Sequence, residues 1–264
     1  MPSEPTATPV AIHHEVSGPA DAPAILLGES LGTTLAMWDG QAPLAERLRT
    51  VRYDHRGHGR SPMPPGPYEI ADLGRDVLAL MDRLGLDRAS HCGVSLGGMV
   101  GMALALQAPQ RVERLVLACT SAYLGPPGGW RERARVVRAD GLEAIADAVV
   151  GRWFTTRASD GEPERVDRFR AMFVSTPPEG YARCCEAIAD WDARDRIADI
   201  AAPVLVVAGA DDPATPLEHA ELIASRIPDA RLRVLEHAAH LANVERADAF
   251  NEALMEHLGQ EVPA

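Results

Sequence analysis

The decisive stretch of this chain is Gly93-Val94-Ser95-Leu96-Gly97, a G-x-S-x-G pattern. Apolar residues 89–94 before it predict a short buried strand, and residues 96–107 after it predict a helix. Ser95 therefore falls on the sharp turn between the two elements, which exposes its hydroxyl. The pattern is typical of a nucleophile elbow.

The glycines at this turn have a steric reason. Gly93 and Gly97 lie two residues before and after Ser95, where a closely crossing strand and helix leave no room for side chains. The first amides of the helix then point at whatever Ser95 attacks, with the positive end of the helix dipole behind them. A serine in an ordinary glycine-rich turn is the alternative, and the rest of the chain decides between the two.

A serine nucleophile of this kind needs an acid and a histidine, which follow it in that order. Residues 203–208 form a continuous apolar run that predicts a buried parallel strand, and Asp211 and Asp212 come shortly after it. Acids at the carboxyl end of such a strand lie beside the crevice of the sheet. We favour Asp212, because the following turn at residues 213–216 contains two prolines that fix its backbone, and Asp211 stays an alternative.

The base is expected after the next strand, at residues 231–235, which runs into His237 and His240. Ala238 and Ala239 are small and suit a loop tip pressed against the serine, so His240 is the favoured base. His237 lies closer to the strand and is expected to cap it.

Composition fits one large enzyme domain. A chain of 264 residues with 46% hydrophobic content can bury a full α/β core. The net charge of -12 argues against a nucleic-acid partner and against an anionic membrane.

Nothing in the chain predicts export. Residues 1–10 are proline-rich and polar, so we expect no signal peptide, and no apolar run approaches the length of a membrane span. The four cysteines show no disulfide spacing. We therefore expect a reducing cytoplasm, with the cysteines in the core.

Strand-like and helical runs alternate along most of the chain. The expected strands are residues 10–16, 24–27, 50–53, 89–94, 114–119, 203–208 and 231–235, and the expected helices near the start are 41–48 and 70–84. Such alternation predicts an α/β fold with a mainly parallel sheet flanked by helices. It breaks off over residues 121–199, where charged helical stretches replace strands. The predicted organisation is a core of residues 1–120 and 200–264 with a helical lid insertion at 121–199.

These features resemble the α/β-hydrolase superfamily. The resemblance covers nearly the whole chain and rests on the elbow, the Asp-His-Arg-Gly-His-Gly-Arg-Ser turn at residues 54–61, Asp212 and His240. Further segments resemble the 3-oxoadipate enol-lactonase family, which acts in aromatic catabolism. They are Ser-Leu-Gly-Thr and Met-Trp within residues 30–38, Arg-Trp-Phe-Thr at 152–155, residues 179–188, and Ala-His-Leu-Ala-Asn-Val-Glu at 239–245. The chain departs from the family at Glu29, where asparagine is expected.

The resemblance implies a mechanism for a small anionic lactone. Ser95, deprotonated by His240, would attack the lactone carbonyl while Asp212 orients the imidazole. The amides of Leu31 and Leu96 would form the oxyanion hole. No metal or organic cofactor is required.

The lid supplies the expected substrate-binding residues. Trp130, Trp153 and Tyr181 could line the pocket or pack the lid helices, and the sequence leaves both readings open. Arginines recur at positions 131, 133, 135 and 138, a pattern typical of a solvated helix face. Arg133 lies one turn after Trp130, so the two share a face, and we choose it to meet a substrate carboxylate.

Other functions stay open within the same fold. A carboxylesterase or cofactor-free perhydrolase would keep the same three catalytic residues without needing a lid arginine, and a slow ligand-sensing protein would keep them with little turnover. A dehalogenase is disfavoured, because its nucleophile would be aspartate. The histidine pairs at residues 13–14 and at 55 and 58 lack a third ligand at suitable spacing, so no metal is expected.

Overall fold

The computed structural model describes residues 8–260, and within them seven strands form a single sheet. The strands are His14–Ser17 (β1), Ala24–Gly28 (β2), Arg49–Tyr53 (β3), Ala89–Val94 (β4), Val112–Ala118 (β5), Val204–Gly209 (β6) and Ala230–Leu235 (β7). Their order across the sheet is β1-β3-β2-β4-β5-β6-β7. Only β1 runs antiparallel, against β3, so the predicted mainly parallel sheet is confirmed.

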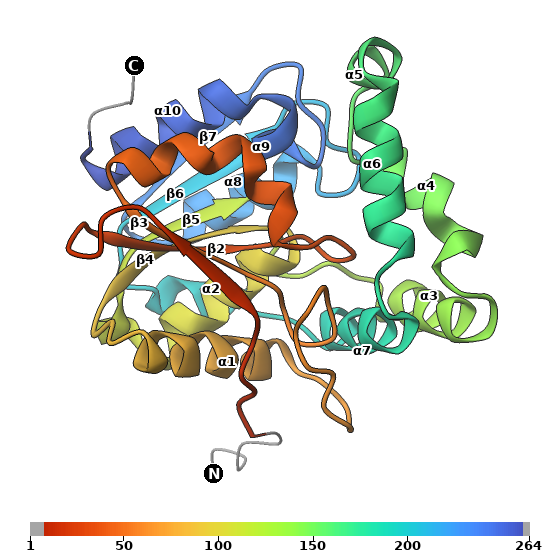
Figure 1. The fold of residues 1–264 in the computed structure, drawn as a ribbon, viewed down its shortest axis with the longest axis horizontal. Helices are drawn as coiled ribbons and strands as arrows, with labels where there is room; N and C mark the ends of the chain where they lie inside the picture. The colour runs from red at the N-terminus through yellow and green to blue at the C-terminus, as the bar shows by residue number, and fades with distance from the viewer. Residues whose placement is uncertain (1–7, 261–264) are drawn as a thin grey trace.

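Helices cover both faces of this sheet (Figure 1). On one side α9 (Ala242–Glu245) and α10 (Ala247–Leu258) pack with the 3-10 segment η1 (Leu35–Glu46). On the other, α1 (Ile70–Arg83) packs against α2 (Leu96–Gln107), and α2 contacts β4 and β5. In the carboxyl-terminal part of the chain, α8 (Leu217–Arg226) contacts β6 and β7. The central strands β2, β4 and β6 are buried along their whole length, as the apolar runs predict.

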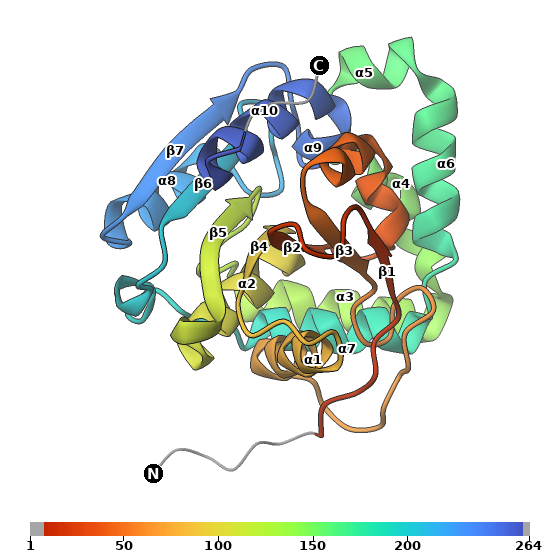
Figure 2. The same cartoon turned by 60° about the vertical axis from the view of Figure 1, so that its left-hand side comes forward.

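Between β5 and β6 the chain leaves the sheet and forms a group of helices, which we call the insertion helices or the insertion. They are α3 (Pro127–Asp140), η3 (Leu142–Ile145), α4 (Ala146–Val150), α5 (Thr156–Gly161), α6 (Pro163–Val174) and α7 (Pro178–Ala189). Figure 1 and Figure 2 show this group to one side of the sheet, with α3 and α7 packed along each other. The expected absence of a buried strand between β5 and β6 is confirmed for this fully described stretch, in which one isolated bridge joins Tyr123 and Asp192.

Two predicted elements were wrong in part. The strand expected at residues 10–16 forms only from His14, because the Val10 amide donates to Asp76 and the His13 amide donates to Ser61 instead of to a neighbouring strand. The helix expected at residues 41–48 is a 3-10 segment that begins earlier, at Leu35. Pro43 lies inside it and has no amide hydrogen to donate to an α-helical bond.

All four cysteines are free and buried, as expected from their spacing. No helix within residues 8–260 is both long and apolar enough to cross a bilayer. The division into core and lid stays a prediction, and the expectation of no signal peptide falls largely on residues 1–7, outside the described part of the chain.

Candidate active site

Ser95 occupies a strained turn between β4 and α2. Its φ of 55° and ψ of -111° lie in a region that side chains rarely adopt. Neighbouring backbone holds it there: the Ser95 amide donates to the Ala118 carbonyl at 2.9 Å, and Thr120 Oγ1 donates to the Ser95 carbonyl at 2.6 Å. The predicted strand, turn and helix are all observed.

The glycines around Ser95 are required by close contacts. A Cβ added at Gly93 would lie 2.1 Å from the Gly97 carbonyl carbon. One added at Gly97 would lie 2.2 Å from the carbonyl oxygen of Gly28 on β2. Any side chain at these positions would displace α2 from the sheet, which confirms the steric explanation drawn from the sequence.

Asp212 and His240 are brought together by the loops after β6 and β7. His240 Nδ1 lies 2.9 Å from Asp212 Oδ2, and since an ionised carboxylate only accepts, this nitrogen carries the hydrogen. Thr215 Oγ1 donates to the same carboxylate oxygen at 2.6 Å. Burial opposes ionisation of Asp212, but the charge of His240 and the hydrogen bonds from His240 and Thr215 outweigh it and lower its pKa. The arrangement leaves His240 Nε2 free to accept a proton.

The neighbouring alternatives lie elsewhere. Asp211 is exposed, and its amide donates to the Ala238 carbonyl. His237 is exposed as well, with a φ of 57°. Neither side chain reaches the pocket that Ser95 and His240 line.

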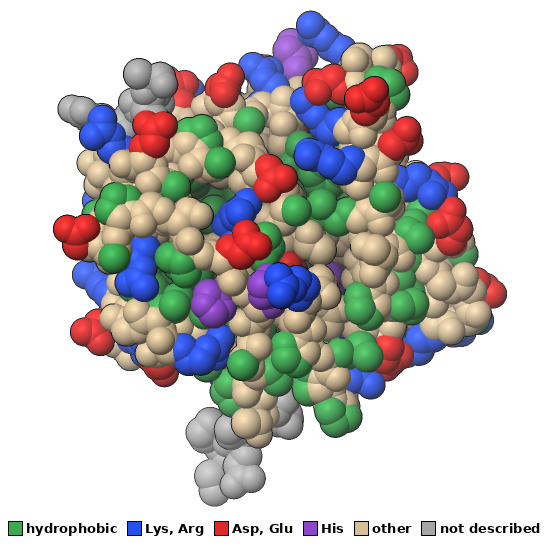
Figure 3. Space-filling view, viewed as in Figure 1, with side chains coloured by type: hydrophobic (Ala, Val, Ile, Leu, Met, Phe, Trp, Pro, Cys, Tyr) green, Lys and Arg blue, Asp and Glu red, His purple; other side chains and the backbone are tan. Residues whose placement is uncertain are grey.

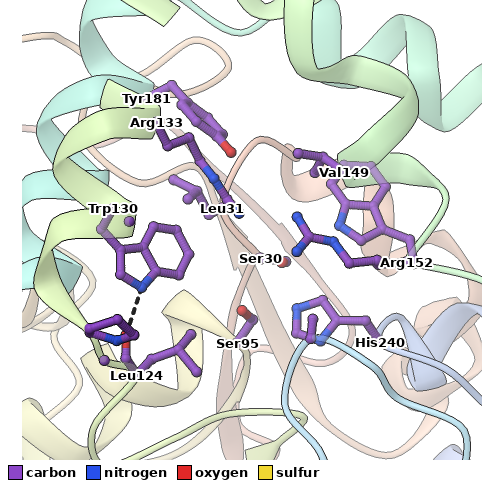
Figure 4. Close-up of a pocket in the computed structure, with 15 residues that line it drawn as sticks. Ser30, Leu31, Ser95, Leu124, Trp130, Arg133, Val149, Arg152, Tyr181 and His240 are labelled. Carbon is purple, nitrogen blue, oxygen red and sulfur yellow. Dashed lines mark hydrogen bonds between the residues drawn. The ribbon is translucent and has the colours of Figure 1, made fainter. Parts of the chain in front are cut away.

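Ser95 and His240 line the same pocket (Figure 4). Both are nearly buried, with 8% and 5% of their surface exposed. In the described structure the Ser95 hydroxyl forms no hydrogen bond to the His240 ring. Such bonds are often long without substrate and shorten in the reacting complex.

The amides predicted for the oxyanion hole lie at the start of α2 and on the loop after β2, beside Ser95. Leu96 is the first residue of α2, so its amide has no partner within the helix. The loop that carries Leu31 is held against α2, because the Gly97 amide donates to the Glu29 carbonyl at 3.0 Å. The Gly32 amide donates to His58 Nε2 at 3.1 Å, which fixes the far side of Leu31.

The turn at residues 54–61 connects elements of the core. The Arg56 guanidinium forms a buried ion pair with Asp76, at 2.6 Å and 2.7 Å. Asp54 accepts from the Leu35 and Arg60 amides. The turn thus ties η1 to α1 beneath the loop that carries Leu31.

The pocket has a volume of about 270 Å³, which suits a small ligand. All four predicted lid residues line it, together with Leu31. Trp130 is fixed in orientation by a bond from its Nε1 to the Leu124 carbonyl at 2.6 Å (Figure 4). Tyr181 is fully buried, and its hydroxyl has no hydrogen-bond partner among the described residues.

Two guanidinium groups enter this pocket. Arg133 comes from α3, where its guanidinium lies 4.4 Å from the centre of the Trp130 ring. Arg152 comes from the turn after α4 and points into the pocket above His240 (Figure 4). Burial, followed by the charge of Arg133, lowers the pKa of Arg152. Neither arginine forms an ion pair with any acid within residues 8–260.

The other arginines of α3 are neutralised at the surface. Arg131 pairs with Asp190, and Arg135 pairs with Glu132. Arg138 pairs with two glutamates of α7, at 2.7 Å and 2.5 Å. Of the four, Arg133 is the one whose charge stays uncompensated inside the pocket.

Sequence reasoning missed Arg152 and Thr215. Arg152 belongs to the quoted segment 152–155, but nothing in its spacing showed which way it points. Thr215 lies three residues after Asp212, a spacing that allows an Asx-type turn and could have indicated the contact.

No group of three or more His, Cys, Asp or Glu side chains is placed to hold a metal ion in the part of the chain that the structure describes. The functional side chains of the site are a serine, a histidine, a carboxylate and two arginines.

Comparison with known proteins finds relatives over most of the chain. The family model described as alpha/beta hydrolase fold matches residues 23–247. The chain is 42% identical over 250 residues to 3-oxoadipate enol-lactonase 2 of Acinetobacter baylyi, covering 94% of this chain and 93% of that one. The resemblance inferred from the sequence is thereby confirmed.

Two further comparisons bear on the substrate. The crystal structure of the enol-lactonase from Burkholderia xenovorans LB400 is 43% identical, with a TM-score of 0.92 over 94% of this chain and 96% of that one. RutD of Variovorax paradoxus, by name a candidate carbamate hydrolase, is 34% identical over 258 residues, covering 94% of this chain and 96% of its own. Relatives at similar coverage therefore carry different substrate names.

Proposed function

The chain belongs to the alpha/beta hydrolase fold family, and we propose that this hydrolase opens the ring of 3-oxoadipate enol-lactone to give 3-oxoadipate. The reaction is a step of the β-ketoadipate route of aromatic catabolism. The enol-lactonase relatives support this substrate, and the pocket supports it independently.

The observation that carries the proposal is the pair of unpaired arginines beside Ser95 and His240. Two like charges in a partly buried pocket are unfavourable unless an anion joins them. A neutral ester would leave both guanidiniums without a partner. The enol-lactone carries a free carboxylate, which a guanidinium can hold through two parallel hydrogen bonds.

Acylation begins when His240 Nε2 takes the proton of Ser95 and the serine oxygen attacks the lactone carbonyl. Asp212 holds the imidazole in the tautomer with hydrogen on Nδ1 and stabilises the cation that forms. The negative oxygen of the tetrahedral intermediate accepts from the amides of Leu31 and Leu96.

Collapse of the intermediate breaks the ring bond between the carbonyl carbon and the enol oxygen. The enol is a better leaving group than an alkoxide, and it takes the proton back from the imidazolium and tautomerises to a ketone. His240 then deprotonates a water that attacks the acyl group on Ser95 and releases 3-oxoadipate with the serine restored. One water is consumed for each lactone, and the step requires no cofactor.

The test compares three substrates on four proteins. The substrates are 3-oxoadipate enol-lactone, the neutral ester p-nitrophenyl acetate and a neutral carbamate, and the variants are Arg133→Ala, Arg152→Ala and Arg131→Ala. We expect each pocket variant to lose roughly 5- to 150-fold in kcat/KM on the lactone, since a charged hydrogen bond contributes about 1–3 kcal/mol, with little change on the ester. Arg131→Ala is the matched control, because it removes an exposed arginine of the same helix.

Three outcomes would contradict the proposal. The parent could turn over the carbamate or the neutral ester with a higher kcat/KM than the lactone. Losses could be equal on lactone and ester, which would indicate damage to the insertion helices. Finally, the lactone could be unaffected by either pocket substitution.

A further inference from the structure

Glu245 lies at the end of α9 and joins two segments that are far apart in the sequence. Its Oε1 accepts from the Thr155 amide at 3.2 Å and from the Thr155 hydroxyl. Its Oε2 accepts from the Ala239 amide at 2.9 Å. One carboxylate thus bridges the insertion helices and the loop that follows β7.

Both joined segments carry side chains of the pocket. Thr155 follows Trp153 by two residues, and Ala239 immediately precedes His240. A second link joins the same segments, since the Leu241 amide donates to the Trp153 carbonyl at 3.0 Å. The backbone on each side of His240 is therefore tied to the segment that places Trp153 in the wall of the pocket.

We propose that Glu245 is a positioning residue that keeps His240 in reach of Ser95 by fixing the His240 loop to the insertion. The inference rests on the proposed role of His240 as the general base. Proton transfer needs the imidazole within hydrogen-bond distance of the serine, and displacements of about 1 Å can cost on the order of a hundredfold in rate. The Ala239 amide lies one residue before His240. Loss of its acceptor, the Glu245 carboxylate, would therefore free the loop next to the imidazole.

A purely structural role predicts something different. If Glu245 only stabilised the fold, its removal would lower the fraction of competent enzyme and the melting temperature while each competent site kept its rate. Active-site titration with p-nitrophenyl acetate counts competent sites through the acyl-enzyme burst. The rate per titrated site therefore separates the two roles.

The experiment measures kcat per titrated site on p-nitrophenyl acetate for Glu245→Ala, Glu245→Gln and the control Glu143→Ala. We expect Glu245→Ala to lower kcat about tenfold or more with a smaller change in KM, because the ester needs His240 but neither pocket arginine. Glu245→Gln keeps one acceptor oxygen and should fall between the parent and Glu245→Ala. Glu143 forms an exposed ion pair with Arg170 on the insertion, so Glu143→Ala should keep the parent rate.

Proton NMR supplies a second readout. The Nδ1 hydrogen that His240 shares with Asp212 should give a low-field resonance that broadens or shifts in Glu245→Ala and stays in place in Glu143→Ala. The proposal is overturned if both Glu245→Ala and Glu245→Gln keep the parent kcat per titrated site. If the alanine variant does not fold, a parent-like kcat in Glu245→Gln alone overturns it. If His240→Ala itself kept its rate, the proposed general base would fail instead.

Discussion

At the residue scale, the backbone strain at Ser95 is tied to its proposed chemistry. A residue held at a φ of 55° costs about 1–3 kcal/mol and persists only where the surroundings enforce it. We expect Ser95→Ala to remain folded, since a methyl group fits the same turn, and to lose a factor on the order of ten thousand or more in kcat. A rate within tenfold of the parent, with an unchanged circular dichroism spectrum, would show that another group is the nucleophile.

The acid and the base each have a neighbour that serves as a matched control. Asp212→Asn should lose activity by orders of magnitude, because the imidazole loses the partner that sets its tautomer, whereas Asp211→Asn should keep most of it. His240→Ala should be as severe as loss of the serine, and His237→Ala should be mild. Steady-state kinetics of the four variants decide the matter, and equal losses within either pair would refute that assignment.

Single residues could be predicted from the sequence where local chemistry specifies them. The glycines beside Ser95 follow from a turn that leaves no space for a Cβ, and Arg133 follows from its helical spacing to Trp130. Arg152 could not be found in this way. It lies after the five-residue helix α4, and its direction depends on how the insertion packs against the His240 loop.

At the element scale, buried strands were the easiest to predict, because β2 and β6 read as unbroken apolar runs. Elements whose backbone bonds go to distant side chains were harder. The segment before β1 is bound by Asp76 and Ser61, which lie 66 and 48 residues from their partners. No local pattern reports such contacts, so the strand was expected four residues too early.

The order of the strands made part of the candidate site predictable, because its acid and its histidine lie on the loops after β6 and β7. Asp212 and His240 were found because parallel strands deliver their carboxyl ends to the same edge of the sheet. Their 2.9 Å contact is a consequence of that topology. By contrast, the link that Glu245 makes between residues 155 and 239 depends on the docking of the insertion, which no single element specifies.

At the scale of the whole molecule, the surface carries charged side chains of both signs, whereas the interior contains histidines that are neutral. The face seen in Figure 3 intersperses acidic and basic side chains, and the exposed arginines of α3, at positions 131, 135 and 138, pair with acids. The interior contains His55, His58 and His91, and burial lowers their pKa values to about 3, 4 and 3. These histidines are neutral in the folded state but protonate near pH 6.5 when unfolded. The contribution of these histidines to the free energy of unfolding is therefore fully present above pH 6.5. It is lost as the pH falls from 6.5 toward their folded pKa values of about 3 to 4.

Glu29 acts in the opposite direction. Burial, followed by the charge of Asp54, raises its pKa well above the ordinary value, and its Oε1 accepts from the His55 amide at 2.7 Å. The folded state then keeps a proton that the unfolded chain has already released, so stability falls as the pH rises from about 4.5 toward the raised pKa.

Glu29→Gln has nearly the same shape but cannot ionise, and its carbonyl can still accept from the His55 amide. We expect the variant to gain free energy of unfolding relative to the parent as the pH rises, by up to about 1.4 kcal/mol for each pH unit between the unfolded and folded pKa values. Urea unfolding of both proteins at pH 4.5, 6 and 8 measures the difference, which should be near zero at the lowest pH and largest at the highest. A difference that stays constant over this range would mean that Glu29 does not retain its proton in the folded protein.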